Sequence, residues 1–180
     1  NPEANQVITL EREWSNNDIV ELNIPAEIEL NRWHEKSVSV DRGPLNFVLK
    51  VEGEWKKVQN TQDPEVFGDT YYEVYPTSPW NYGLIDVPED EISEHYKISW
   101  EENVPLYPWK PDESPVQIKM RAKRMLDWKM YNNSAGPLPY SIQWGQRTSE
   151  EEEIITLIPY GCSTLRICEF PLVGNYTVIH

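Results

Sequence analysis

Apolar residues occupy every second position in several separate stretches of this chain. The longest lies at residues 116–122, where polar or basic residues fill the intervening positions. Shorter stretches with the same period lie at residues 20–24, 38–40, 47–51 and 154–158. Successive side chains of a β-strand point to opposite faces of its sheet, so this period predicts strands with one buried and one solvated face. Such strands are typical of antiparallel sheets.

Helices are disfavoured, because the fifteen prolines leave few windows of helix length. One exception is residues 88–93, where a proline at the first position predicts a single helical turn. With 180 residues, the chain is long enough to form one sizeable core. We therefore predict one all-β domain over residues 1–180, an antiparallel β-sandwich of the jelly-roll type.

Three stretches, residues 59–83, 101–115 and 129–149, interrupt the alternation and are predicted as long loops rich in Pro and aromatic residues. Loops of this length are often functional or packed against another domain. Five aromatic residues lie in or beside the first two: Trp80, Tyr82, Trp100, Tyr107 and Trp109.

These five rings have more than one interpretation. Aromatic rings near amides and carboxylates can bind a sugar, because ring faces stack on its C–H groups while its hydroxyls find polar partners. The same rings can instead fasten the long loops onto the sandwich, or dock it against another domain. All three interpretations stay open at this point.

The charge of the chain excludes some partners. Thirty acidic residues against sixteen basic ones give a formal charge of −14, whereas binding nucleic-acid phosphates requires concentrated Lys and Arg. No apolar run approaches the roughly 18 residues that a membrane span needs. We therefore expect neither a nucleic-acid nor a membrane partner. The chain begins without Met and without a signal-peptide pattern, so we expect a fragment or a processed product.

Residues that carry chemistry are sparse. The three histidines do not lie at metal-ligand spacing, and the spacing of Cys162 and Cys168 matches no common zinc pattern. Cys168 lies between apolar neighbours and is predicted to be a buried free thiol, although a bridge to Cys162 is an alternative. Neither a Gly-x-Ser-x-Gly turn nor a Gly-rich phosphate loop is present. We predict no catalytic residue, no metal site and no cofactor, although thirty carboxylates leave a glycosidase pair open.

Several short motifs resemble glycoside hydrolase family 127, the β-L-arabinofuranosidase-like group. The resemblance begins with residues 12–22 and continues through Ile24-Pro25 and the Arg-Gly-Pro-Leu of residues 42–45. Asn17 stands where that family usually has Gly, a change that a turn tolerates because Asn also adopts positive φ. Residues 158–161, 165–167 and 170–171 are similar to the closing strands of the family.

The resemblance implies a bacterial parent protein in which a helical (α/α) barrel carries catalysis and β-sandwich domains follow it. The family's Cys nucleophile and its zinc-binding Cys and Glu belong to that barrel, and no motif here matches them. The chain would then be the C-terminal sandwich, with residues 1–30 as the last strands of a preceding one. Its partner would be the catalytic barrel, and its location periplasmic or secreted.

Two functions are therefore expected. The first is a non-catalytic accessory domain that supports the catalytic barrel of a glycoside hydrolase. The second is a carbohydrate-binding module that holds a plant-type polysaccharide with the five loop aromatics named above.

Overall fold

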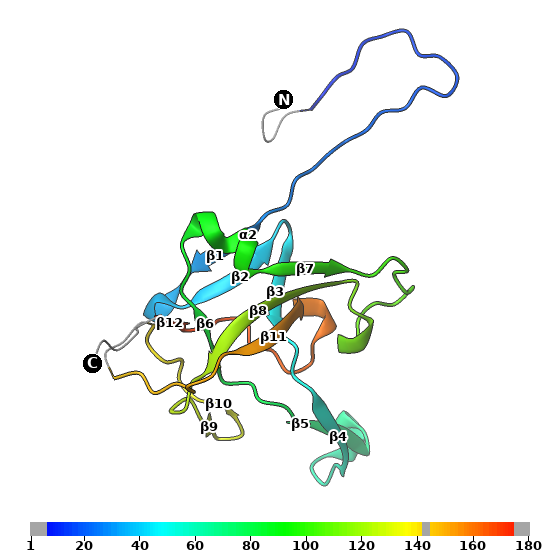
Figure 1. Cartoon of the computed structure of the whole chain (residues 1–180). Coiled ribbons are helices and arrows are strands. Elements are labelled where there is room, and N and C mark those ends of the chain that lie inside the picture. The colour runs from blue at the N-terminus through cyan, green and yellow to red at the C-terminus, as the bar shows by residue number, and fades with distance from the viewer. Residues whose placement is uncertain (1–6, 142–144, 175–180) are drawn as a thin grey trace, which may run out of the picture.

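Strands make up most of the regular structure (Figure 1). The computed structural model describes residues 7–141 and 145–174. The main sheet contains β1 (Ile28–Arg32), β2 (Val38–Arg42), β3 (Leu45–Leu49), β6 (Tyr82–Ile85), β7 (Lys97–Trp100), β8 (Val116–Arg124), β11 (Glu153–Pro159) and β12 (Leu172–Val173). Two separate hairpins are β4 (Gly53–Gln59) with β5 (Thr70–Pro76), and β9 (Met130–Tyr131) with β10 (Ser134–Ala135).

The strands of the main sheet follow the order β1-β2-β3-β11-β8-β6-β12, and β7 also pairs with β8. All of these pairs are antiparallel except β12 with β6. The prediction of an all-β, mostly antiparallel fold is therefore confirmed, whereas the jelly-roll arrangement stays a prediction. The short helices are η1 (His34–Lys36), α1 (Pro64–Phe67), η2 (Glu89–Glu91), α2 (Ile92–His95), η3 (Pro111–Glu113) and η4 (Tyr160–Cys162).

The main sheet curls back on itself. Phe170, just before β12, and Val38 of β2 donate backbone hydrogen bonds to each other, each 2.9 Å long. The far end of the strand order therefore returns to β2. The curled sheet encloses large side chains with no exposed surface, including Phe47, Ile118 and Phe170. Because apolar burial is the main favourable term in folding, this enclosed cluster stabilises the fold.

The central strand β8 confirms the alternation predicted at residues 116–122. Its four apolar residues are buried, and Lys119 and Arg121 between them are exposed. Strand β11 pairs with one edge of β8, and both β6 and β7 pair with the other. The helical turn predicted at residues 88–93 is also confirmed, as η2 followed by α2 between β6 and β7.

Residues 42–45 form a hairpin turn between β2 and β3. Gly43 has φ +55° and Pro44 fixes φ near −65°, which is the combination expected of a type II′ turn. This turn type matches the right-handed twist of paired strands. The motif therefore reverses the chain within one sheet, and β3 begins immediately after it.

The prediction of a long loop at residues 59–83 is wrong. The β4–β5 hairpin occupies most of it, and α1 caps the hairpin between Asp63 and Gly68. Residues 70–75 contain Tyr and Val, which favour strands, but the prolines on both sides concealed this signal. Residues 101–110 are irregular as predicted, and residues 129–141 contain the small β9–β10 hairpin.

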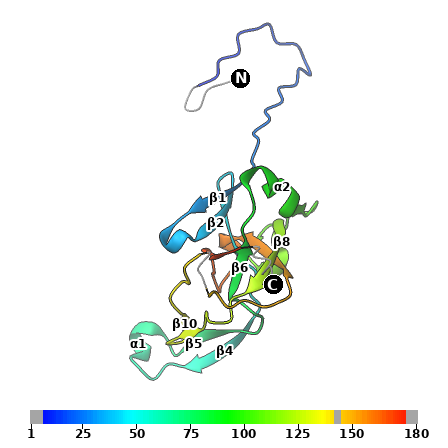
Figure 2. The same cartoon turned by 60° about the vertical axis from the view of Figure 1, so that its left-hand side comes forward.

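Residues 7–27, which we call the N-terminal arm, contain no helix or strand and extend away from the sheet (Figures 1 and 2). The alternation at residues 20–24 predicts a strand there. In the structure Leu22 and Ile24 are instead 68% and 75% exposed. A strand needs a neighbour for its backbone hydrogen bonds, and the described part of the chain provides none for the arm.

Candidate ligand cavity

A cavity of about 470 Å³ lies between the two small hairpins and the end of the main sheet. Its walls are strand β5, residues 133–135 of the β9–β10 hairpin, residues 165–167 and Trp80. These segments are far apart in sequence and meet only in the folded chain. In Figure 2 the β9–β10 hairpin lies beside β4 and β5, in agreement with these shared walls.

The edge of β5, rather than one of its faces, borders this cavity. Four consecutive residues, 73–76, line it. Because successive side chains of a strand point to opposite faces, a cavity that touches all four must lie along the edge. Strand β5 pairs with β4 on its other edge. Backbone N–H and C=O groups of the free edge are therefore available to a ligand beside the side chains.

Trp80 is the aromatic wall of the cavity, and its neighbours hold it in place. Its ring meets that of Trp128 edge to face, with centroids 5.2 Å apart and an interplanar angle of 74°. Next along the chain, the Asn81 amide donates to the backbone oxygens of Met125, at 2.7 Å, and of Trp128, at 3.1 Å. Trp80 also packs against the main core while lining the cavity. Its ring is therefore pre-positioned.

Glu73 is the acidic group of the cavity. Its carboxylate accepts a short hydrogen bond from the Tyr75 hydroxyl, and Tyr71 donates to its other oxygen at 3.4 Å. The hydrogen bond to Glu73 is the main cause that raises the pKa of Tyr75 above its usual value. Lys56 lies 4.7 Å from the centre of the Tyr75 ring. The carboxylate is thus held by its own strand, with a lysine nearby.

Arg166 adds a cation to the lining, from the segment of residues 165–167. Its Nε donates to the Ser163 carbonyl at 2.9 Å, and its guanidinium lies 4.3 Å from the centre of the Tyr160 ring. These two contacts restrict the orientation of the guanidinium plane. The cavity is therefore lined by the Glu73 carboxylate, the Arg166 guanidinium, the Asn133 amide and the Trp80 ring. Such a mixture can bind a small neutral ligand with both polar and apolar surfaces.

The structure separates the five aromatic residues predicted as a group. Only Trp80 lines this cavity. Trp100 pairs with Val116 at one end of β8, whereas Tyr82 pairs with Arg124 at the other. Eight residues of strand separate these ends, roughly 27 Å at 3.4 Å per residue. The two aromatic positions therefore do not belong to one binding face.

The prediction that Tyr82 is a sugar-binding loop residue is wrong. It is 5% exposed and belongs to the core, so its ring faces are not available to a glycan in the solvent. Its hydroxyl donates to Glu153 at 2.7 Å. Burial, followed by this hydrogen bond, raises the pKa of Tyr82 to about 12. Its position just inside β6, on the buried side of the sheet, is the physical reason.

The other three rings remain accessible. Trp100, Tyr107 and Trp109 are 59%, 70% and 65% exposed. The Arg42 guanidinium lies 4.7 Å from the centre of the Trp100 ring. Trp109 lies against Gly161 of η4. One of its neighbours is therefore the turn that follows β11.

Sequence reasoning did not identify Glu73, Tyr75, Asn133 or Arg166. Glu73 and Tyr75 lie on a strand predicted as loop, and Asn133 and Arg166 lie about 60 and 90 residues further along the chain. No spacing rule links such positions. The local signal for this hairpin was the pair Asn132-Asn133, because Asn tolerates the positive φ of a turn. Both residues adopt positive φ in the structure, +49° and +60°.

A separate polar network ties β1, β2 and β3 together around Asp41. Its carboxylate accepts hydrogen bonds from Asn31 at 3.0 Å, Ser39 at 2.7 Å and Asn46 at 2.9 Å. Trp33 Nε1 donates in turn to the Ser39 hydroxyl at 2.9 Å. Burial raises the pKa of Asp41, but the three hydrogen bonds together outweigh burial and lower the pKa below its ordinary value. The charged form of Asp41 is therefore stabilised by folding.

The substitution Asp41→Asn should destabilise the protein near neutral pH by about 1–3 kcal/mol, because an amide cannot accept all three hydrogen bonds. Since the pKa of Asp41 is lowered in the folded state, its contribution is present above the unfolded pKa of about 4 and is lost as the pH falls through the folded pKa. Urea unfolding of both proteins from pH 7 to pH 2.5 should show the difference shrinking below about pH 4. Asp90→Asn, at an exposed position, is the control. A difference that stays constant with pH would contradict the assignment.

Both cysteines are free, so the bridge that the spacing left open does not form. Cys162 is buried, and its thiol contacts the Pro108 carbonyl at 3.0 Å. Burial raises the pKa of this thiol and also that of Cys168. In the described residues, no three His, Cys, Asp or Glu side chains gather as a metal site. Within the same ranges, no helix has the length and apolarity to cross a membrane.

The chain was also compared with known proteins. No family model, no curated protein and no solved structure matches it.

Proposed function

We propose that this chain is a non-catalytic accessory β domain of a bacterial glycoside hydrolase of the β-L-arabinofuranosidase-like group. In this proposal it docks against a helical catalytic barrel in the same parent protein. The sequence resemblance at residues 12–25 and 42–45 supports the class of the parent. The observation that carries the docking role is the set of apolar side chains exposed along the N-terminal arm.

The arm exposes apolar side chains on both sides of one turn. Leu10 and Trp14 precede the turn and are 55% and 52% exposed, whereas Val20, Leu22 and Ile24 follow it and are 58–75% exposed. Fully burying one such side chain is worth roughly 1.5–3 kcal/mol. Several of them in one segment therefore favour a covered state in the complete protein.

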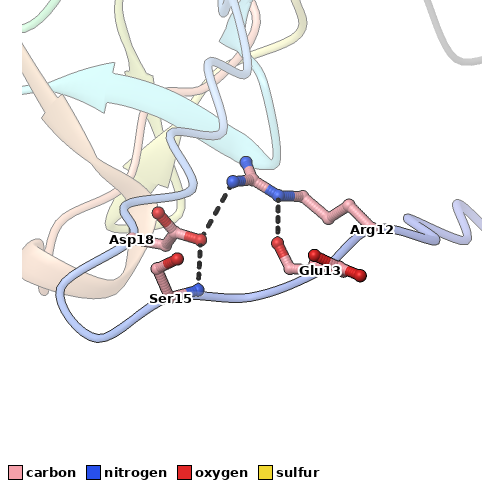
Figure 3. Close-up of polar contacts among 4 residues, drawn as sticks. All are labelled: Arg12, Glu13, Ser15 and Asp18. Atoms are coloured by element: carbon pink, nitrogen blue, oxygen red, sulfur yellow. Dashed lines mark hydrogen bonds and ion pairs between the residues drawn. The ribbon is translucent and has the colours of Figure 1, made fainter.

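The turn in the arm is itself ordered by polar contacts, as Figure 3 shows. The Asp18 carboxylate accepts from the Arg12 guanidinium at 2.9 Å and from the Ser15 N–H at 2.8 Å. The Asp18 N–H also donates to the Ser15 carbonyl, at 3.1 Å. Asn17 adopts φ +73° within this turn. The arm thus has the form of two strand-like segments joined by a turn. This supports the proposal that the stretch of residues 1–30 before β1 belongs to a preceding sandwich, whereas residues 28–30 pair with β2 in the present sheet. A jelly-roll arrangement of the present sheet is also part of the proposal.

A second apolar surface lies on the β4–β5 hairpin, at the end of the molecule opposite the arm (Figures 1 and 2). Trp55 and Tyr72 meet edge to face with centroids 6.0 Å apart, and each is 58% exposed. Aromatic residues are enriched at protein interfaces. This hairpin is therefore a second contact surface in the proposal.

Hydrogen exchange tests the docking role. In the full-length parent protein, the amides of residues 19–24 should exchange slowly, because docking gives them partners. In the 180-residue chain alone they should exchange within seconds. Equally fast exchange in both proteins would contradict docking through the arm. Turnover of an aryl arabinofuranoside by the 180-residue chain would contradict the non-catalytic assignment.

A second candidate function is a carbohydrate-binding module. The observation that favours it is the combination of exposed aromatic rings at Trp100, Tyr107 and Trp109 with the Trp80 cavity. Calorimetry against arabinose-containing glycans and other plant polysaccharides tests this function. Heat of binding with any of them supports the candidate, and its absence with all of them excludes it.

A further inference from the structure

We propose that the cavity beside Trp80 binds one sugar ring of a neutral glycan. The inference rests on the second candidate function and assigns its binding site to residues that the sequence did not indicate. A volume of about 470 Å³ lies within the range of small-molecule sites. The cavity is bounded by secondary structure on two sides, β5 and the β9–β10 hairpin.

The apolar part of the cavity suits the C–H face of a sugar. Trp80 supplies the ring for stacking, and Leu165 and Ile167 lie in the adjacent wall. Trp128 positions two of the walls at once. It contacts the Trp80 ring edge to face, and its Nε1 donates to the Gly136 carbonyl, just after β10, at 3.0 Å. A wall that is already ordered loses little conformational freedom when a ligand binds.

The polar part of the cavity suits hydroxyl groups, which both donate and accept hydrogen bonds. Glu73 provides an acceptor, Arg166 provides donors, and the amide of Asn133 provides both. The free edge of β5 adds backbone groups of both kinds. A neutral polyol can therefore use every polar group of the cavity.

The charged side chains of the cavity do not favour an ion of one sign. Glu73 and Arg166 both line it and carry opposite charges. An anion would be repelled by Glu73 and a cation by Arg166, so the lining has no net charge that would require a charged ligand.

The experiment is a calorimetric titration of the 180-residue chain with arabino-oligosaccharides and xylo-oligosaccharides. Three variants test the cavity: Trp80→Ala, Glu73→Gln and Asn133→Gly. Trp80 packs against the core, so Trp80→Ala can disturb folding. Glu73→Gln keeps the side-chain size, and glycine tolerates the positive φ of Asn133. Phe67→Ala is the control, because Phe67 is an exposed aromatic residue on α1 that does not line the cavity. Trp109→Ala tests the exposed loop rings as the alternative site.

We expect each cavity variant to weaken binding by tenfold or more, and Phe67→Ala to leave it unchanged. Binding that is lost only in Trp109→Ala would overturn the cavity assignment while keeping the carbohydrate-binding function. Unchanged affinity in both Glu73→Gln and Asn133→Gly would also overturn it. Absence of binding to any oligosaccharide would overturn both the site and that function, and the docking role is tested separately by hydrogen exchange.

Discussion

Replacing Phe170 by alanine should lower the free energy of unfolding by about 3–5 kcal/mol, the usual cost of truncating a fully buried phenylalanine. Phe170 has no exposed surface and belongs to the main core cluster. Its backbone also pairs with Val38 where the sheet curls back on itself. The substitution leaves a void at this junction, where residues from two ends of the strand order meet.

Urea unfolding, followed by tryptophan fluorescence, measures this effect. Phe67→Ala is the matched control, because Phe67 undergoes the same substitution at a position that is 74% exposed on α1. The control should change stability by less than about 0.5 kcal/mol, as is usual for surface substitutions. Similar losses for the two variants would contradict the placement of Phe170 inside the curled sheet.

Replacing Gly83 by alanine should destabilise the protein by about 1–3 kcal/mol, the usual cost of overpacking a core. Gly83 lies in β6, between β8 and β12. A Cβ there would lie 2.9 Å from the Met125 sulfur, 3.0 Å from Val173 Cγ1 and 3.1 Å from the Pro171 carbonyl oxygen. The Met125 side chain can move, but the backbone oxygen of Pro171 is held next to the β6–β12 pairing. The added methyl group therefore pushes β12 away from β6.

Thermal unfolding of Gly83→Ala and Gly161→Ala compares two glycines with different surroundings. A Cβ at Gly161 would meet only the Trp109 ring, at ordinary contact distances of 3.5 and 3.6 Å. We expect a lower Tm for Gly83→Ala and a small change for Gly161→Ala. Equal changes in the two variants would show that the close approach of β12 to β6 is not needed for stability.

Sequence patterns predicted the structure correctly where the pattern and the element that it predicts involve the same few neighbouring residues. The alternation at residues 116–122 became the buried and exposed faces of β8. Pro88 came directly before the helical turns of η2 and α2. Each of these outcomes depends on backbone preferences or on a period of two, which neighbouring residues alone express.

Sequence patterns failed to predict the structure where pairing with a distant segment of the chain decides whether a strand forms or a side chain is buried. Residues 20–24 alternate as clearly as a strand, yet they form none, because a strand requires hydrogen bonds from another segment. Tyr82 was predicted as an exposed loop aromatic and is buried, because β6 pairs between β8 and β12. Neither the pairing nor its absence can be inferred from the residues themselves.

The sequence by itself determined the all-β class, the face of β8 that is buried and the helical turn that follows Pro88, since these follow from periodicity and backbone preference. The tertiary structure alone decided the curling of the sheet through Phe170 and Val38 and the gathering of Glu73, Trp80 and Arg166 around one cavity. Contacts between distant segments depend on which strand edges and apolar faces meet in space. The pairing of edges and faces that forms is the one that leaves the least apolar surface exposed and the fewest backbone groups unpaired over the whole chain.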